Sequence, residues 1–384
     1  EVFFGLPVLV LAELASGYLF TEVQCEDRRY ETWKEQIQSW WSQSGWECHF
    51  MVSDRAKALI KLATEGLGCV SVADWFHALR SLGRPIGGAL GRQQARVAQQ
   101  IKTVIAQREA TPHEAKRLEL DQALAELSTQ SDRLAQDHQR YHQAMTTMTL
   151  SLHPFQLDNQ APQTVSDIIP RLQNALTPLR DLGSTYGGQK AAQALRGFEQ
   201  QLPDIARGLQ AWWHWALQSL AAQTPSIDVQ NWVLGVLLPW VYWQQQTDKT
   251  HSPELKARYQ QVVNQAAHRL LSHPLTQSMA VDERQSWIDW ARWMANNYQR
   301  TSSAVEGRNG YLTRLHHSGR GFSPQTLKVL TILHNFHLQR PDGTTAAQRL
   351  FSYEFPDLFE WVVGHSGDLP LARRSLKAQR PNPL

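Results

Sequence analysis

Two carboxylates occupy positions from which acidic side chains can bind metal ions. Asp54 follows residues 47–53, a segment that predicts a strand, and a carboxylate at the C-terminal end of a strand lies where α/β proteins bind ligands. Glu306 falls in the first turn of a helix predicted to begin at Ser302 or Ser303. Hard cations select carboxylate oxygens, and two ions roughly 4 Å apart can activate the attacking oxygen and stabilise the leaving oxygen of a phosphodiester. Both acids are therefore candidates for metal-dependent phosphodiester chemistry.

Both acids also have a purely structural interpretation. Aspartate favours the N-cap of a following helix, which fits Asp54, and a glutamate in the first helical turn gains from the helix dipole, which fits Glu306. A two-metal site normally needs at least three acids, and only these two are plain in the sequence. The first acid of such a set is missing.

A basic cluster follows Glu306 along the chain. Its members are Arg308, Arg314, His316, His317 and Arg320. Arginine and histidine side chains near a carboxylate suit an anionic substrate that is held on a metal ion. Asn309 lies three residues after Glu306 and therefore shares its helix face. These neighbours favour a binding site over a simple capping role for Glu306.

The first part of the chain predicts a mixed α/β fold. Apolar segments around an Ala-Ser-Gly turn predict a strand hairpin over residues 7–23, and a three-and-four spacing of large apolar residues predicts a helix over 31–42. A strand over 47–53, a helix over 55–65 and a short strand over 69–73 follow. Strands that alternate with helices favour a partly parallel sheet covered by helices.

From about Arg92 to Asn297 the sequence changes character. Gln, Ala, Leu and Arg dominate, and no segment has a convincing strand pattern, so we expect a large all-helical region. Trp287, Trp290 and Trp293 lie near one stripe of a helix. The tryptophans of this region are most simply core residues of a helical bundle, and base stacking along a nucleic-acid path is the alternative.

Composition narrows the class of protein. The 384 residues include 38 Lys and Arg against 35 Asp and Glu, a net charge of +3, so any surface that attracts nucleic acid must be local. Three cysteines without C-x-x-C spacing argue against a zinc ribbon and a disulfide framework and fit a reducing cytoplasm. Glu13 interrupts the apolar start too early for a membrane span, and no basic segment precedes it as in a signal peptide.

Two motifs near the predicted strand ends resemble those of DDE-type transposases of prokaryotic insertion sequences. Val52-Ser-Asp54 resembles the segment that carries the second catalytic acid in these families. Asp74-Trp-Phe-His77 resembles the [CD]-x-x-H signature that follows that acid in many members with a helical insertion. Their order along this chain is the order found in the family.

The resemblance extends to both ends of the family's catalytic domain. Ser303-Ala-Val-Glu-Gly-Arg-Asn309 resembles the segment around the third acid, which here is Glu306. The start, Glu1-Val-Phe-Phe4, resembles a D-E-x-F-F-like strand, so the family's first Asp would come immediately before residue 1. Its absence implies an N-terminal truncation.

This resemblance implies a particular architecture. The fold would be an RNase H-like α/β core, with a mixed sheet flanked by helices, interrupted by a large all-helical insertion. The core would occupy residues 1–91 and 298–340, the insertion 92–297, and a C-terminal tail 341–384.

The implied function is metal-dependent DNA strand cleavage and strand transfer. Asp54 and Glu306 would be catalytic residues and ligands of two Mg²⁺ or Mn²⁺ ions, while Asp74, His77 and Asn309 would support the site. The basic cluster after Glu306 would contact DNA. Transposon-end and target DNA are the implied partners, together with further copies of the chain in a homo-oligomer, without a membrane. The implied location is the bacterial cytoplasm, in association with the nucleoid.

Two further functions stay open at this point. Because the first acid is missing, the chain can be a catalytically inactive, transposase-derived protein that binds DNA. The long Gln- and Ala-rich region also fits a helical scaffold that binds protein partners. In a scaffold, Asp54 and Glu306 would lie far apart, with no basic groove beside them.

Overall fold

The computed structural model describes residues 2–3, 6–319 and 323–367. Its contacts divide the chain into two compact units. Unit 1 comprises Glu1–Glu26 and Gly307–Leu384, and unit 2 comprises Asp27–Glu306. The boundary falls inside helix α12 (Ser303–Gly319), so that Glu306 belongs to unit 2 and Gly307 to unit 1.

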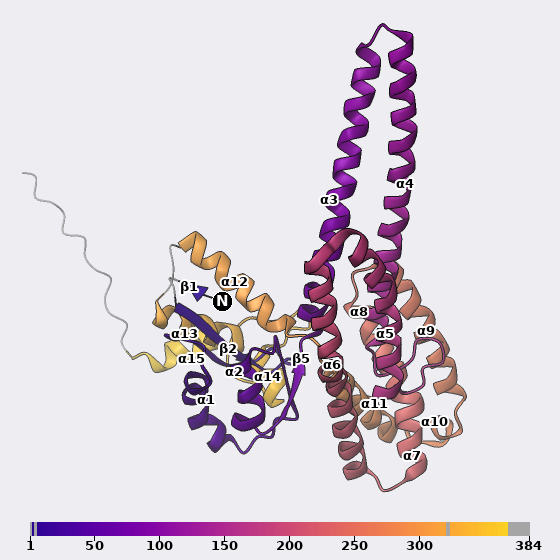
Figure 1. The fold of residues 1–384 in the computed structure, drawn as a ribbon. Coiled ribbons are helices and arrows are strands. Elements are labelled where there is room, and N and C mark those ends of the chain that lie inside the picture. The colour runs from indigo at the N-terminus through magenta and orange to yellow at the C-terminus, as the bar shows by residue number, and fades with distance from the viewer. Residues whose placement is uncertain (1, 4–5, 320–322, 368–384) are drawn as a thin grey trace, which may run out of the picture. The chain divides into compact units, whose positions relative to one another are not determined.

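The predicted fold class, an RNase H-like α/β core with a mixed sheet, is wrong. The described residues are mostly helical (Figure 1), and their strands form two separate small sheets, an antiparallel β1-β2-β3 sheet and a parallel β4-β5 pair. In unit 2, helix α6 (Gly188–Gln223) packs on strand β5 (Val70–Ala73). The contact is close, because a Cβ atom at Gly208 would come within 2.6 Å of Val72 Cγ1. A helix therefore buries this strand pair without further strands.

Unit 1 contains the antiparallel sheet. Strands β2 (Leu6–Ala12) and β3 (Leu19–Gln24) form the hairpin predicted for residues 7–23, and the short β1 (Val2–Phe3) pairs with β2. The other elements of this unit are the part of α12 from Gly307, α13 (Pro324–Phe336), α14 (Ala346–Phe351) and α15 (Leu358–His365). Its small core joins the sheet to two helices through Val8, Leu312 and Leu327.

Asn335 fixes helix α13 to strand β3. Its side-chain amide accepts a hydrogen bond from Leu19 N at 2.9 Å and donates one to Leu19 O at 3.0 Å. The amide thus replaces a neighbouring strand at the end of the sheet, which satisfies both backbone groups of a buried residue.

Unit 2 begins with short elements close to those predicted. They are α1 (Tyr30–Ser44), β4 (Phe50–Ser53), α2 (Lys57–Lys61) with a π-helical turn η1 (Leu62–Gly66), and β5. Strands β4 and β5 are parallel and pair in register from Phe50↔Val70 to Ser53↔Ala73. Both strands therefore end at the same edge.

Long helices make up the rest of unit 2. They are α3 (Trp75–Ala110), α4 (Glu114–Ser151), α5 (Val165–Leu182) with η2 (Gly183–Gly187), α6, α7 (Ile227–Trp232) with η3 (Val233–Leu237), α8 (Leu238–Lys249), α9 (Pro253–Ser272), α10 (Pro274–Ser278) and α11 (Val281–Asn296). Helices α3 and α4 run side by side as a hairpin whose far part projects beyond the other helices of this unit (Figure 1). No helix in the described part of the chain has the length and apolar character that crossing a membrane requires.

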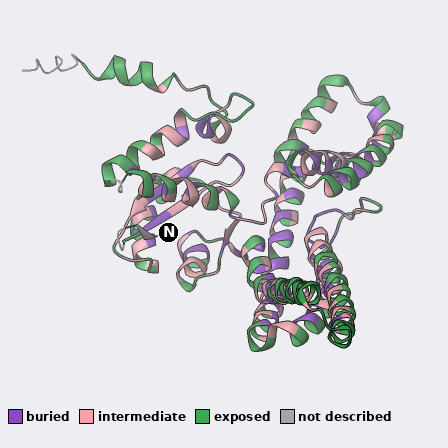
Figure 2. Ribbon diagram, turned by 90° about the horizontal axis from the view of Figure 1, so that it is seen from above, coloured by how far each residue is buried: buried purple, intermediate pink, exposed green. Residues whose placement is uncertain are grey.

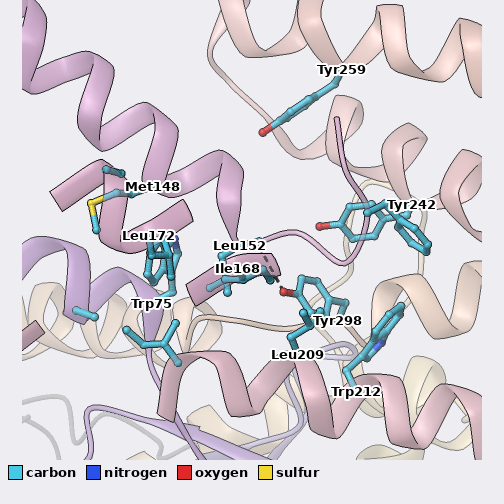
Figure 3. Packing of buried hydrophobic residues seen from close by; sticks show 14 of the residues in the cluster. Trp75, Met148, Leu152, Ile168, Leu172, Leu209, Trp212, Tyr242, Tyr259 and Tyr298 are labelled. Atoms are coloured by element: carbon cyan, nitrogen blue, oxygen red, sulfur yellow. Dashed lines mark hydrogen bonds between the residues drawn. The ribbon is translucent and has the colours of Figure 1, made fainter. Parts of the chain in front are cut away.

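Leucines and large aromatic residues together form the core of unit 2 (Figure 3). Trp212, Trp232 and Trp243 are almost completely buried, and Tyr298 donates a hydrogen bond to Leu152 O at 3.4 Å. These three tryptophans therefore serve the bundle core, as large aromatic side chains commonly do. Burial in both units is concentrated on the inner faces of helices, and the far part of the α3–α4 hairpin is largely exposed (Figure 2).

Candidate functional site at the ends of strands β4 and β5

Asp54 and Asp74 lie at the same edge of the parallel strand pair. Each follows the last residue of its strand, Ser53 in β4 and Ala73 in β5, and these two residues are paired in register. Asp74 N also donates a hydrogen bond to Ser53 O at 2.8 Å. Because neighbouring strands lie about 4.8 Å apart, the backbones at the two acids are close together.

A tight turn presents Asp54 to solvent. Its Oδ1 accepts a hydrogen bond from Ala56 N at 3.0 Å, two residues on, whereas the N-cap of α2 is Ala56. Arg55 has a left-handed backbone with φ of 62°, which is unfavourable for a residue with a side chain. Its guanidinium holds the turn in place through a 2.8 Å ion pair with Asp204 of α6.

Asp74 connects two segments that are far apart in the sequence. It is buried, with 2% of its surface exposed, and its Oδ1 accepts a hydrogen bond from His77 N as the N-cap of α3. Its Oδ2 accepts hydrogen bonds from Ser302 N at 2.6 Å and Ser302 Oγ at 2.5 Å. Trp75 N donates to Arg300 O at 2.8 Å, so residues 300–302 are fixed to the start of α3.

This attachment brings Glu306 to His77. The His77 ring has Nδ1 at 3.3 Å from Asp74 Oδ1 and Nε2 at 3.8 Å from Glu306 Oε1. Its Nδ1 is buried and makes no hydrogen bond within the described residues. The side chains of His77 and Glu306 are 32% and 43% exposed. A histidine ring therefore lies between a buried carboxylate and an open one, and we call Asp74, His77 and Glu306 the acid–histidine group.

Hydrogen bonding determines the charge of the buried acid. Burial raises the pKa of the Asp74 carboxyl, but the hydrogen bonds from Ser302 and from His77 N lower it further than burial raises it. The net pKa lies below the ordinary value of 3.8, so Asp74 is ionised at neutral pH.

The predicted basic cluster divides into residues with different surroundings in unit 1. Arg308 is buried and forms a bidentate ion pair with Glu22, with nitrogen–oxygen distances of 2.7 and 2.6 Å. Thr331 Oγ1 donates a further hydrogen bond to Glu22 Oε2. The guanidinium of Arg308 is thus engaged inside unit 1 and is not free to contact DNA.

The remaining residues of the predicted site differ in exposure. Arg314 and His317 are exposed on α12, and His316 is half-buried. Asn309 is half-buried and its Oδ1 makes no hydrogen bond in the described residues. Arg320 lies outside the residues that the structure describes.

Carboxylate oxygens on two of the acids are available for a cation. Asp54 accepts one hydrogen bond, at Oδ1 only, and Glu306 accepts none among the described residues, whereas both oxygens of Asp74 are occupied. Available carboxylate oxygens fit a hard divalent ion in type. In number they fall short of a two-metal site, because the described residues contain no group of three or more His, Cys, Asp or Glu placed to hold a metal.

Sequence reasoning missed two residues of these networks. Ser302 was considered as a helix cap, but its hydroxyl binds Asp74 instead. Glu22 drew no attention because it lies in a strand, far along the chain from Arg308. A buried acid among apolar strand residues was the available signal, since such an acid needs a cationic partner.

The comparisons with known proteins reach only part of this site. The family model DUF6399, described as a family of unknown function, matches residues 233–378, less than half of the chain. The matched segment contains Glu306 but not Asp54, Asp74 or His77. A search of curated proteins found no match, and a search of solved structures found none either.

Proposed function

We propose that this protein acts on DNA as a transposase, by metal-dependent strand cleavage and strand transfer. The observation that carries the proposal is the contact between His77 and Glu306. These residues come from two motifs on opposite sides of a long helical region, and both motifs resemble those of DDE-type transposases. The proposal concerns the site and its chemistry, not the mixed sheet of the family.

The position of Asp54 gives further support. Asp54 follows β4 at the same sheet edge at which Asp74 follows β5. The acid that resembles the family's second catalytic acid therefore lies at the edge that carries the acid–histidine group. The left-handed Arg55 and its ion pair with Asp204 keep this exposed carboxylate in a fixed turn. Backbone strain of this kind is concentrated at functional sites.

Asp54 and Glu306 are the residues that would hold divalent cations. When bound, such ions stabilise negative charge on phosphate and on the attacking and leaving oxygens. Two available carboxylates do not by themselves complete a two-metal site among the described residues. The remaining residues have roles of their own. Ser302 and the N-terminus of α3 hold Asp74, and Asp74 orients His77. The His77 ring then lies beside Glu306, with Nε2 at 3.8 Å from Glu306 Oε1.

The test is DNA cleavage by the whole chain. The substrate is duplex DNA that flanks the coding sequence, where a transposase finds the ends it recognises, with Mg²⁺ or Mn²⁺ added. We expect strand nicks that require the divalent ion. Asp54→Asn and Glu306→Gln should each abolish nicking, because each removes a carboxylate that binds the ion. His77→Gln should reduce it by roughly 10- to 100-fold, as expected for a residue that positions a ligand.

The matched control is Asp132→Asn on α4. Asp132 is an exposed carboxylate in unit 2, and the structure gives it no ion pair within the described residues, so its loss makes the same charge change away from the site. This variant should cleave like the unaltered chain. Equal cleavage by Asp54→Asn, Glu306→Gln and the control would reject the assigned site. If the unaltered chain nicks no DNA with either ion, the proposed activity is wrong.

A further inference from the structure

Helix α3 carries positive charge without compensating acids. From Trp75 to Arg108 its sequence contains no Asp or Glu, and the first acid is Glu109. The basic residues of this stretch are Arg80, Arg84, Arg92, Arg96, Lys102 and Arg108. The helix therefore has a local charge excess that the net charge of +3 for the whole chain conceals.

The partner helix of the hairpin contains more acidic than basic residues. Helix α4 contains six acids, which are Glu114, Glu119, Asp121, Glu126, Asp132 and Asp137. Only one of them forms an ion pair with α3, where Asp121 binds Arg108. The other five basic residues of α3 make no ion pair within the described residues, and all five are exposed. We call Arg80, Arg84, Arg92, Arg96 and Lys102 the α3 basic row.

Elsewhere in unit 2, many arginines are paired with carboxylates. Arg55 binds Asp204 at 2.8 Å, Arg180 binds Glu199 at 2.7 Å, and surface pairs at spacings of three residues occur on several helices. Single exposed arginines that form no ion pair in the described part of the chain, such as Arg196 and Arg258, also occur in unit 2, but the row places five such cations along a stretch of helix that contains no acid. A long series of exposed cations without carboxylate partners is unfavourable to stability through self-repulsion, and it suits an anionic ligand that neutralises them.

The helix geometry arranges the row as an extended surface. The buried side of α3 includes Leu82, Ile86, Leu90 and Val97, and the five cations are spread around the exposed remainder of the helix circumference, at about 100° per residue. At 1.5 Å per residue, Arg80 and Lys102 are roughly 33 Å apart along the axis, which is the length of about ten base pairs of DNA. The row starts one helical turn after His77 and continues along the projecting hairpin (Figure 1).

The chemistry of the row favours a phosphate backbone. Four of its five members are arginines, whose planar guanidinium binds phosphate oxygens in pairs. The exposed residues between them include Gln94, Gln99 and Gln100, neutral donors that also bind phosphate and sugar. Large apolar side chains that would enter a lipid surface are rare on this face, where Ile105 is the main example beyond Phe76.

We propose that the α3 basic row binds the phosphate backbone of double-stranded DNA and leads it toward the acid–histidine group. The inference rests on the proposed function, because it names the surface that holds the DNA on which the site acts. It assigns the far part of the hairpin to backbone contacts, which position a duplex without reading its sequence.

The test measures DNA binding in the absence of cleavage. A fluorescent 30-base-pair duplex is titrated with the whole chain in EDTA, at several salt concentrations between 50 and 200 mM. The test variant is Arg92→Gln with Arg96→Gln, two exposed positions well beyond His77. Each lost phosphate contact removes about 0.9 from the slope of log K against log salt, so the slope should fall by about 1.8. At 0.1 M salt the same arithmetic gives roughly 60-fold weaker binding.

Two control variants test whether the loss of binding depends on where the charge is removed and on the charge itself. Lys116→Gln with Arg133→Gln removes the same charge from α4, and Arg133 and Arg92 each lie about twenty residues from Pro112 at the turn. This control should bind DNA nearly as the unaltered chain does. Arg92→Lys with Arg96→Lys keeps the charge and should keep most of the salt slope. Circular dichroism checks that each variant retains its helices.

The outcomes distinguish this inference from the proposed function. Equal salt slopes for the α3 and α4 variants would overturn the inference even if the chain cleaves DNA. A specific loss in the α3 variant would support it even if no cleavage is found. Binding to phosphatidylserine vesicles that depends on Arg92 and Arg96, without binding to the duplex, would assign the row to a membrane surface and overturn it as well.

Discussion

The Arg308–Glu22 pair of unit 1 and the His77–Glu306 pair of unit 2 differ in how far they are exposed to solvent. In unit 1, the Arg308 and Glu22 side chains are 2% and 0% exposed and are joined by two short hydrogen bonds. In unit 2, the imidazole of His77 and the carboxylate of Glu306 are partly open and lie 3.8 Å apart. One arrangement is closed to any ligand, whereas the other has polar atoms left to bind one.

This difference separates structural charges from functional ones. A buried ion pair is costly to break because the remaining charge has no partner, although the intact pair adds little over apolar residues. An open pair contributes little to stability and can change partners during a reaction. We therefore expect substitution of the buried Arg308 to alter folding and substitution of the partly exposed His77 and Glu306 to alter activity.

Arg308→Met should cause the largest loss. It leaves Glu22 buried without its cation, and such a change costs about 3–5 kcal/mol in the free energy of unfolding. Urea denaturation followed by circular dichroism measures this loss. Adding Glu22→Leu to the same chain should recover much of it, because both charges are then removed. A double variant as unstable as Arg308→Met would show that packing of the guanidinium, and not charge pairing, stabilises unit 1.

Asp74→Ala should have an intermediate effect. It removes the N-cap of α3 and leaves Ser302 N without its acceptor, which costs roughly 1–3 kcal/mol. The loss should depend on pH. Because the pKa of Asp74 in the folded chain lies below 3.8, its carboxylate stabilises the fold above that pH and ceases to do so as the pH falls through the folded-state value.

The difference in urea midpoint between the unaltered chain and Asp74→Ala should therefore be constant near neutral pH and shrink below about pH 3.8. Asp74→Asn is the companion variant, since it keeps an acceptor oxygen but no charge. A difference that grows on acidification would contradict the assignment of a lowered pKa to the hydrogen bonds from Ser302 and His77.

The sequence could predict local elements but not contacts between segments that are far apart in the chain. Local patterns identified the hairpin around β2 and β3, helix α1 and the ends of β4 and β5, because these depend on neighbours within a few residues. They did not determine how strands combine into sheets. The parallel pair is closed by α6, whose Gly208 packs on Val72, and no periodicity in either segment indicates that contact.

The site was predictable to a similar extent. The strand-end position pointed to Asp54, and the family resemblance pointed to Asp74 and Glu306, but neither indicated that Ser302 binds Asp74. Arg308 was assigned to a DNA surface because it belongs to the basic cluster that follows Glu306 in the sequence. Its partner Glu22 lies 286 positions away in the sequence, so only the folded structure could identify the pair.

Glu306→Gln and His77→Gln should have the smallest effect on stability. The pair they break is partly exposed, so the free energy of unfolding should change by less than about 1 kcal/mol. The same variants are expected to lose DNA cleavage, and this combination separates a functional carboxylate from a capping acid. A capping glutamate would show the reverse, with a measurable loss of stability and unchanged cleavage. Urea midpoints and nicking rates on the same preparations decide between the two, because a variant that unfolds like the unaltered chain has lost chemistry and not structure.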